Sequence, residues 1–254
     1  LMTLRAIQGL GIGGEWGGAL LMAVENSSKT TKSLFGSVPQ MGVPLGMLFG
    51  TAALNFVGNR VSEAEFLEWG WRLPFVSSAV LVAIGLWLRF RINETPEFEE
   101  AKKKGKQVKI PLVATLKYHW REVILAIGLK VVETAPFYIL STFVITYVTK
   151  TLSLPKNVVL TAITWATIAC VFMIPLMGVF ADRIGRRRMY GWGAFIMMLY
   201  AFPYFAMLNT KDPVLIAVAT VVGLGIIWTP ITAVLGTLSA EIFDPEVRYT
   251  GVTL

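Results

Sequence analysis

Seven long apolar stretches dominate this chain of 254 residues. They cover residues 3–25, 34–58, 70–91, 121–149, 157–181, 189–209 and 213–240. An apolar run of about 20 residues crosses a bilayer as a helix. Membrane-spanning strands are only about ten residues long and alternate in polarity, which these stretches do not do. The sequence therefore predicts an all-α, polytopic transmembrane helix bundle.

The cations in the loops between these stretches are sorted onto one side. Sixteen lie in loops on the first side: Lys29, Lys32, Arg89, Arg91, Lys102, Lys103, Lys104, Lys106, Lys109, Lys117, Arg121, Arg183, Arg186, Arg187, Arg188 and Arg248. Only five lie on the second side: Arg60, Arg72, Lys150, Lys156 and Lys211. Cationic loops stay in the cytoplasm. The first side is therefore predicted to be cytoplasmic, and residues 3–25 run from outside to inside.

Composition argues against a soluble enzyme or a nucleic-acid-binding protein. The chain is 55% hydrophobic and 15% charged, and its net charge of +7 is explained by the cytoplasmic loops. Cys170 lies in an apolar stretch and His119 at a loop end, and each is the single residue of its type, so we expect no disulfide and no metal site. No nucleotide-binding glycine motif and no catalytic triad is present. We expect no cofactor and no enzymatic activity.

The longest loop divides the chain. Residues 1–91 hold three apolar stretches, residues 92–120 form a cytoplasmic connection, and residues 121–254 hold four stretches and the start of a fifth. The chain begins with Leu1 rather than Met, and its last four residues resemble the start of a helix. We therefore expect a bundle that is incomplete at both ends.

The first stretch carries ionisable and amide side chains. Glu15 lies ten residues after Arg5, or about 15 Å along a helix at 1.5 Å per residue, which places it near mid-membrane. A carboxylate at that depth costs about 2.5–3.5 kcal/mol and usually faces a cavity. Two interpretations stay open: Glu15 is a hydrogen-bonded packing residue, or it carries a coupling proton and is tuned by Arg5. Gln8 shares the face of Glu15 and is a candidate for the substrate cavity.

The fourth stretch carries a second polar group. Lys130 and Glu133 are three residues apart and can form a local ion pair. Both lie well inside the predicted hydrocarbon layer, so Glu133 is also a proton-coupling candidate and Lys130 a cavity candidate. Pro136 can break the helix beside such a site. Tyr138 and Thr142 follow as candidate substrate ligands.

Two further stretches contribute candidates beside prolines. Gln40 follows Pro39 in the second stretch, where glycines recur four residues apart. That spacing favours close helix packing, and Gln40 is a possible substrate contact. In the last stretch, Trp228, Thr229, Pro230 and Thr232 form a comparable polar patch, and Trp228 is a further cavity candidate.

Residues 182–188 form a short cytoplasmic turn rich in arginine. Asp182 and Arg183 precede Gly185, which permits a tight turn, and Arg186 and Arg187 follow it. The turn is either a cationic anchor at the membrane surface or a gating latch in which Asp182 pairs with a base or a helix end. A faint internal echo adds Glu25, Glu241 and Arg248 to the gating candidates, because each half carries an acid at the inner end of a glycine-bearing helix.

The sequence of residues 182–187 resembles the loop signature of the major facilitator superfamily, in its second-half copy. Residues 5–18, with their Gly-Gly-Glu-Trp-Gly-Gly segment, resemble the fourth-helix motif of its metabolite:proton symporter branch, as do residues 70–75 and 94–98. The resemblance covers the whole chain as helices four to ten and the start of helix eleven. It implies a twelve-helix, two-bundle carrier that works by alternating access.

The resemblance favours a secondary transporter that imports a small polar metabolite together with a proton. Organic acids and zwitterionic osmolytes fit Arg5 and Lys130 as counter-charges, and the choice between them stays open. The alternatives are a sugar-type facilitator of the same superfamily and a non-transporting membrane sensor. We expect a monomer in the bacterial inner membrane whose partners are the substrate, the proton and the bilayer.

Overall fold

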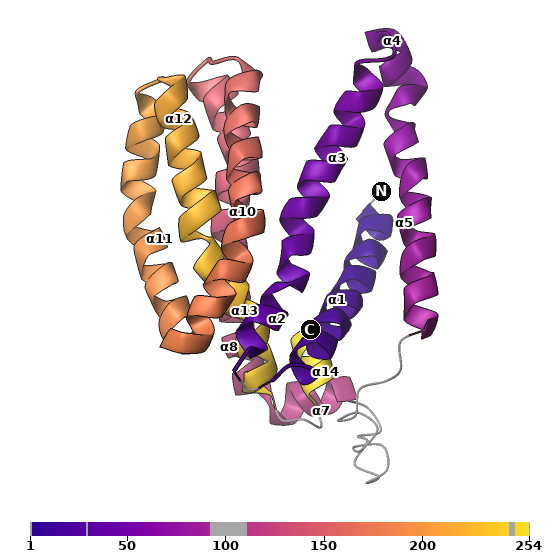
Figure 1. Ribbon diagram of the computed structural model, residues 1–254, viewed down its shortest axis with the longest axis vertical. Coiled ribbons are helices and arrows are strands. Elements are labelled where there is room, and N and C mark those ends of the chain that lie inside the picture. Colours follow the sequence, from indigo (N-terminus) through magenta and orange to yellow (C-terminus); the bar gives the residue numbers. More distant parts are fainter. Residues whose placement is uncertain (1, 29, 92–110, 244–246, 254) are drawn as a thin grey trace.

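The computed structural model describes residues 2–28, 30–91, 111–243 and 247–253, and every regular element in these ranges is a helix. The helices form two groups that meet at one end of the molecule and diverge toward the other (Figure 1). The helices of the N-terminal group are α1 (Met2–Glu25), α2 (Lys32–Ser37), η1 (Pro39–Met41), α3 (Gly42–Gly58), α4 (Glu63–Glu65), η2 (Phe66–Gly70) and α5 (Arg72–Arg91).

The C-terminal group begins with two helices at the end where the groups meet and continues into long antiparallel helices. Its elements are α7 (Pro111–Tyr118), α8 (Trp120–Tyr138), η3 (Ile139–Phe143), α9 (Val144–Thr146), η4 (Tyr147–Thr151), α10 (Lys156–Ile184), α11 (Arg186–Asn209), α12 (Pro213–Thr220), η5 (Val221–Ile227), α13 (Thr229–Ile242) and α14 (Arg248–Thr253).

Six helices in the described ranges are long and apolar enough to cross a membrane. They are Lys32–Gly58, Phe66–Leu88, Trp120–Thr151, Lys156–Ile184, Arg186–Asn209 and Pro213–Ile242. Each matches one of the predicted apolar stretches. The predicted first span is also a helix, α1, but it is not among these six. Its glycines and the charged Arg5 and Glu15 make it less apolar than the others.

The connection predicted for residues 92–120 contains a helix, α7, which starts at Pro111. Proline is favoured at the first position of a helix because its missing N–H would have no partner there. Residues 92–110, which include the whole 94–98 motif and most of the predicted loop, lie outside the described residues.

Prolines lie inside several long helices without ending them, and turns of another type adjoin two of these prolines. Pro136 lies inside α8, and the chain continues directly into the π-helical turn η3. The break considered at Pro136 is therefore absent, because wider turns accommodate the missing N–H. Pro39 begins the 3₁₀ turn η1 inside the helix Lys32–Gly58, which likewise continues past it.

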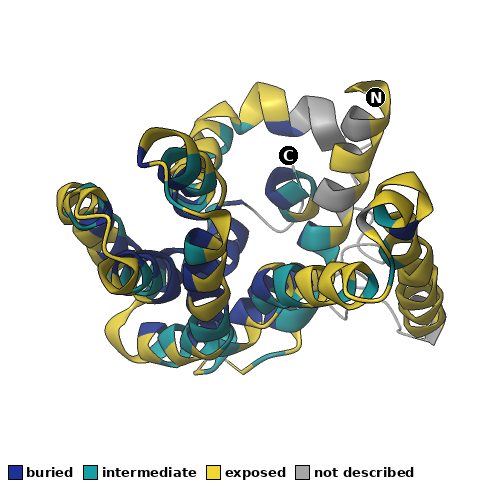
Figure 2. Ribbon diagram, turned by 90° about the horizontal axis from the view of Figure 1, so that it is seen from above, coloured by how far each residue is buried: buried dark blue, intermediate teal, exposed yellow. Residues whose placement is uncertain are grey.

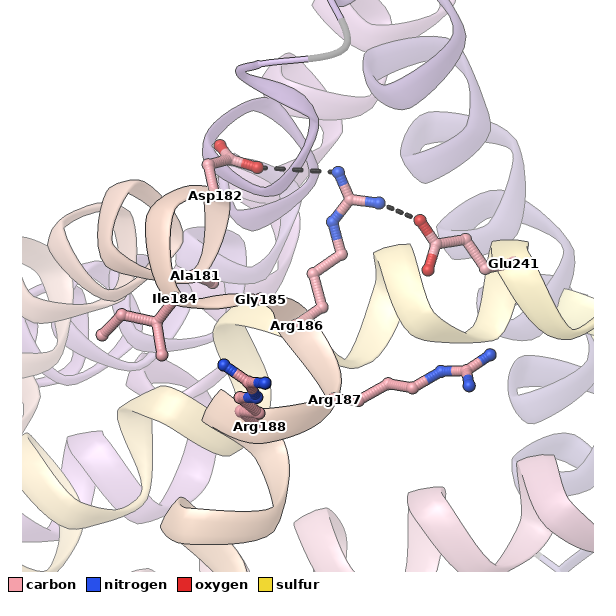
Figure 3. Close-up of a pocket in the computed structure, with 8 residues that line it drawn as sticks. All are labelled: Ala181, Asp182, Ile184, Gly185, Arg186, Arg187, Arg188 and Glu241. Carbon is pink, nitrogen blue, oxygen red and sulfur yellow. Dashed lines mark hydrogen bonds and ion pairs between the residues drawn. The ribbon is translucent and has the colours of Figure 1, made fainter.

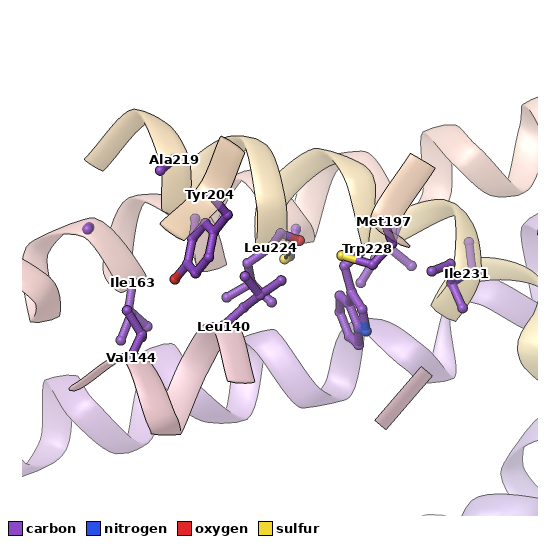
Figure 4. Packing of buried hydrophobic residues seen from close by; sticks show 14 of the residues in the cluster. Leu140, Val144, Ile163, Met197, Tyr204, Ala219, Leu224, Trp228 and Ile231 are labelled. Atoms are coloured by element: carbon purple, nitrogen blue, oxygen red, sulfur yellow. Dashed lines mark hydrogen bonds between the residues drawn. The ribbon is translucent and has the colours of Figure 1, made fainter. Parts of the chain in front are cut away.

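The main hydrophobic core lies within the C-terminal group. Figure 4 shows Leu140 and Val144 packed against Ile163 of α10, with Tyr204 of α11 and Leu224 of η5 beside them. Seen from above, buried residues gather where helices of this group face one another, and most of α3 and α5 is exposed (Figure 2). The exposed side chains of α5 are mainly apolar, as expected for helices that contact lipid or other helices.

The cation-rich loops lie at one end of the bundle and the cation-poor loops lie at the other. The helices α2, α7 and α14 lie where the groups meet, and this end holds Lys32, Lys117 and Arg248 (Figure 1). The opposite end holds α4 and the start of α12, with Arg60 and Lys211 nearby (Figure 1). The groups therefore meet at the predicted cytoplasmic end, and they diverge toward the predicted outer end.

Candidate functional site

Asp182 joins the two groups at the cytoplasmic end. Its two carboxylate oxygens accept hydrogen bonds from the backbone N–H groups of Ser33, at 2.8 Å, and Leu34, at 3.0 Å. These N–H groups lie in the first turn of the helix Lys32–Gly58, where backbone donors have no helical partner and the helix dipole favours an anion. The Asp182 side chain is only 7% exposed, so protein rather than water satisfies it.

Arg186 extends this contact to a third helix. Its Nε donates to the Ser33 hydroxyl at 2.7 Å, and its Nη2 lies 3.6 Å from Asp182. Its Nη1 also forms an ion pair with Glu241 at the end of α13 (Figure 3). Gly185 makes this possible, because the turn between α10 and α11 requires a φ of 101°, which side chains disfavour. Arg186 therefore links α11, α2 and α13.

An ion pair also joins the two groups nearby. Arg248 of α14 lies 3.9 Å from Glu25 at the inner end of α1, and both side chains are largely buried. Glu25 belongs to the first copy of the internal echo and Arg248 to the second. We name the set Asp182, Arg186, Glu241, Glu25 and Arg248, together with the start of α2, the latch cluster.

Glycines bring the backbones of the two groups into contact beside the latch cluster. A Cβ added at Gly178 of α10 would lie 3.0 Å from the Leu34 Cα, 3.0 Å from the Ser33 carbonyl oxygen and 2.8 Å from the Ser37 hydroxyl. Gly36 of α2 packs against the side chain of Thr237 of α13. Backbone atoms cannot move aside as the end of a flexible side chain can, so this interface requires glycine at Gly178.

Deeper in the molecule, Glu133 is the centre of a polar cluster. Its carboxylate accepts from Lys130 Nζ at 3.0 Å, from the Thr134 hydroxyl at 2.9 Å and from the Thr232 hydroxyl at 3.3 Å. The Trp228 indole donates to the Glu133 carbonyl at 2.9 Å. Glu133 is 7% exposed. A carboxylate this deeply buried needs such partners, because burial without them is costly.

The N-terminal group completes this cluster with Trp16 and Gln40. The Trp16 indole donates to Gln40 Oε1 at 3.1 Å, and Lys130 Nζ lies 5.3 Å from the centre of the Trp16 ring. An indole nitrogen only donates, so this bond fixes which end of the Gln40 amide is the oxygen. Gln40 is 4% exposed, and its Nε2 has no hydrogen-bond partner among the described residues. We name Trp16, Gln40, Lys130, Glu133 and Thr232 the central cluster.

The structure leaves several sequence candidates outside both clusters. Gln8 and Glu15 are exposed on α1, and Tyr138 and Thr142 are exposed on the opposite group. Arg183 and Arg187 are exposed beside the latch cluster. The backbone of Arg5 lies in α1, and its side chain is outside the described part of the chain. The roles predicted for these residues remain predictions.

One member of the central cluster, Trp16, was not among the site candidates from the sequence. Trp16 stands next to Glu15 in the Gly-Gly-Glu-Trp segment, and only one of two adjacent residues can face the C-terminal group. Thr232 lies four residues after Trp228, which puts the two on one helix face. Both belong to the polar patch beside Pro230. Among the described residues, no group of acidic, histidine and cysteine side chains is arranged to hold a metal ion.

Comparison with known proteins gives matches over the full length of the chain. The family model of the Major Facilitator Superfamily matches residues 1–254. The inner membrane metabolite transport protein YhjE of Escherichia coli is 38% identical over 261 residues, covering 100% of this chain and 58% of that protein. The shikimate transporter of Escherichia coli is 34% identical, covering 99% of this chain and 58% of that protein.

The proline/betaine transporter of Salmonella typhimurium is 30% identical, covering 99% of this chain and 52% of that protein. The chain thus spans a little over half the length of these curated relatives, all of which are named as transporters rather than enzymes. No solved structure gives a significant match. The described ranges hold six helices that are long and apolar enough to cross a membrane, and together with these relatives they make this chain a multi-pass inner-membrane protein. It belongs to the Major Facilitator Superfamily.

Proposed function

We propose that this chain forms the central part of a secondary carrier that imports a small polar metabolite together with a proton. The observation that supports it most is the central cluster, in which Glu133 and Lys130 form an ion pair at 3.0 Å inside a membrane-spanning helix. Ionisable residues at such positions are costly and commonly mark substrate or ion pathways. The relatives named for shikimate, proline and betaine support a polar, carboxylate-bearing substrate.

The carboxylate of the substrate is recognised by the unpartnered amide of Gln40 and by the exposed ammonium group of Lys130. The amide Nε2 of Gln40 has no partner among the described residues, although it is buried. The Lys130 side chain is 55% exposed, so its ammonium group is reachable, whereas the Glu133 side chain is 9% exposed. A carboxylate held by Nε2 of Gln40 and Nζ of Lys130 would satisfy both. Organic acids and zwitterions share this group.

Glu133 is the residue of this cluster that carries the proton. Protonation at its Oε2 would neutralise the charge that holds Lys130 Nζ at 3.0 Å. Lys130 would then be free to pair with a substrate carboxylate, and release of the proton would restore the original ion pair. Proton binding and substrate binding are thereby coupled through one lysine. Glu15 remains the second candidate for this role.

The arrangement of the two groups supports a cycle of alternating access. Residues 1–91 and 121–254 belong to the N- and C-terminal bundles, and residues 92–120 connect them in the cytoplasm. The latch cluster closes the cytoplasmic end in this conformation, and its opening would expose the central cluster to the cell interior. The carrier works as a monomer, because each element of this cycle lies in one chain.

Uptake by the full-length carrier in proteoliposomes tests this function. Shikimate-like acids, dicarboxylates and betaines are offered with and without an inward proton gradient. We expect at least one class to accumulate only with the gradient. Glu133→Gln should abolish accumulation while leaving exchange of internal for external substrate, because exchange needs no net proton transfer.

The variant Glu15→Gln provides the comparison. Loss of accumulation in Glu15→Gln but not in Glu133→Gln would assign the proton to Glu15. Uptake that ignores the gradient in the unmodified carrier would remove the symport proposal and favour a facilitator. Absence of uptake for every polar metabolite would favour a membrane sensor.

A further inference from the structure

Two adjoining pockets lie at the cytoplasmic end of α11. The first has a volume of about 410 Å³ and is lined by Ala181, Asp182, Ile184, Gly185, Arg186, Arg187, Arg188 and Glu241 (Figure 3). The second has a volume of about 370 Å³ and is lined by Arg188, Gly191, Trp192 and Phe195. Arg188 lines both, so a polar pocket and an apolar groove meet at its side chain.

The polar pocket carries positive charge that the protein leaves unneutralised. Both of its acids, Asp182 and Glu241, are paired with Arg186. Arg187 and Arg188 are exposed and form no ion pair or hydrogen bond with any residue that the structure describes. Neither acid is therefore free to attract a cationic group, whereas two guanidinium groups are free to attract an anion.

The apolar groove continues from Arg188 toward the membrane centre. Trp192 and Phe195 follow Arg188 by four and seven residues, or about 6 and 10 Å along the helix axis. Their side chains are 63% and 48% exposed, and their rings pack edge to face with centroids 6.1 Å apart. A Cβ added at Gly191 would meet nothing within 4 Å, so the groove is open there.

This order of groups matches the order of groups in a phospholipid. A cation lies at the depth of the phosphate, an indole at the interface, and a phenyl ring at the start of the acyl chains. A free phosphate or a soluble anion would use Arg188 but would leave Trp192 and Phe195 without a partner. The groove therefore requires a ligand that carries both an anionic headgroup and an apolar chain.

We propose that Arg188 and the groove formed by Gly191, Trp192 and Phe195 bind one anionic phospholipid of the cytoplasmic leaflet. The phosphodiester contacts the guanidinium of Arg188, and one acyl chain lies along the groove. Arg187 adds attraction at longer range. The absence of a free acid in the polar pocket selects an anionic headgroup over a zwitterionic one.

Lipid retention by the full-length carrier tests this site. The purified protein is mixed in detergent with phosphatidylglycerol, phosphatidylethanolamine or phosphatidylcholine of identical acyl chains, and bound lipid is counted by native mass spectrometry. We expect one phosphatidylglycerol to be retained selectively. Arg188→Gln should reduce its affinity roughly fivefold, as expected for one cation near a lipid headgroup. Arg188→Lys should restore most of it.

Matched variants separate the site from general membrane contact. Arg183→Gln removes an exposed cation of the same turn that lines neither pocket, and it should leave retention unchanged. Gly191→Leu should fill the groove and weaken binding, whereas Gly128→Leu, at another exposed glycine with open space around it, should not.

Equal retention of the three lipids, or equal effects of Arg188→Gln and Arg183→Gln, would overturn the proposal. So would unchanged retention in Gly191→Leu, because the groove would then hold no acyl chain. Quenching of tryptophan fluorescence by brominated phosphatidylglycerol provides a second readout. The variant Trp192→Phe identifies the part of the quenching that comes from Trp192. That part should be lost in Arg188→Gln. If it persists in Arg188→Gln, the proposal is overturned.

Discussion

Gln40 is a residue whose environment points to a ligand. Its amide oxygen is held by the Trp16 indole, and its amide nitrogen is buried without a partner among the described residues. An unpaired buried donor costs about 1–3 kcal/mol. This cost is recovered when a substrate oxygen accepts from it, so the amide favours ligands that carry an acceptor at this point.

We predict that Gln40→Ala weakens substrate binding. Loss of a hydrogen bond to a charged carboxylate costs about 1.5–3 kcal/mol, or roughly 10- to 150-fold in affinity. The KM for uptake by the full-length carrier should rise by that factor, with a smaller change in kcat. The control is Asn55→Ala, which removes an exposed amide of the same helix. Equal effects of the two variants would show that Gln40 does not contact the substrate.

The sequence identified the ionisable residues of the central cluster but not the side chains that contact them from other helices. Lys130 and Glu133 were predicted as a pair because they are close in the sequence and share a helix face. Trp16 and Thr232 were not, because contacts between distant helices depend on the rotation of each helix about its axis. Neighbours on a helix point about 100° apart, so a glycine-rich helix such as α1 leaves that rotation undetermined.

The long helices hold the two groups together through contacts at their inner ends. The start of α2 receives the carboxylate of Asp182, and the backbone of α2 lies against Gly178 of α10. Both contacts join the N-terminal group to the C-terminal group, and neither lies within one group. They therefore stabilise one relative position of the two groups rather than the fold of either.

We predict that Asp182→Asn opens the cytoplasmic end. The amide keeps one acceptor but loses the charge that interacts with the start of α2 and with Arg186. That interaction contributes about 1–2 kcal/mol at a partly buried helix end, or roughly five- to thirtyfold in the closed population. The reporter is Thr237→Cys, whose site is 1% exposed and lies under Gly36, in a background where Cys170 is Ala. Its alkylation rate should rise by that factor.

The matched control for this change is Asp212→Asn. Asp212 also accepts a backbone hydrogen bond at a helix start, from Val214 at 2.8 Å, but at the outer end of α12. The variant Asp212→Asn should leave the alkylation rate at Thr237→Cys unchanged. A similar increase in both variants would mean that the reporter follows general loosening rather than release of the latch cluster.

We predict that Gly178→Ala also opens the cytoplasmic end, in this case for a steric reason. The added methyl group meets the α2 backbone at 3.0 Å, and overpacking of this kind costs about 1–3 kcal/mol in the closed state only. Alkylation at Thr237→Cys should again accelerate. Gly46→Ala, at an exposed glycine with nothing within 4 Å, is the control. An unchanged rate in Gly178→Ala would show that α2 and α10 are not in contact in the membrane.

The positions of the long helices were largely predictable, since the length of the apolar stretches and the charge of the loops identify them. The sequence was less informative about turns within them. Pro136 is followed by the π turn η3 rather than by a break, and a π turn has no simple sequence signature. For Asp182 the sequence left two kinds of partner open, a base or a helix end. Its target, the start of α2, could only come from the fold.

The whole molecule consists of two groups of helices that touch at the cytoplasmic end and diverge toward the other end (Figure 1). The contact between them includes the Arg248–Glu25 ion pair and glycine packing. It also includes a smaller apolar cluster in which Leu20 and Val24 of α1 lie with Phe243 and Val252. The main core lies within the C-terminal group. Parting of the groups at this end therefore leaves the main core intact but separates the smaller apolar cluster.

The central claim is that the two groups move against each other as the carrier works, with one end closing while the other opens. Two distances measured by pulsed electron spin resonance in the full-length carrier test it directly. One spin-label pair is placed at Thr30 and Arg183, exposed near the latch cluster, and the other at Asn59 and Lys156, exposed at the outer end. Cys170, which is buried, is replaced by Ala in both.

Addition of substrate at low pH should lengthen the distance between Thr30 and Arg183 and shorten the distance between Asn59 and Lys156. Asp182→Asn should produce part of the same change without substrate. If both distances change in the same sense, or if neither changes while substrate is bound, then the two groups do not alternate and the proposed mechanism is contradicted.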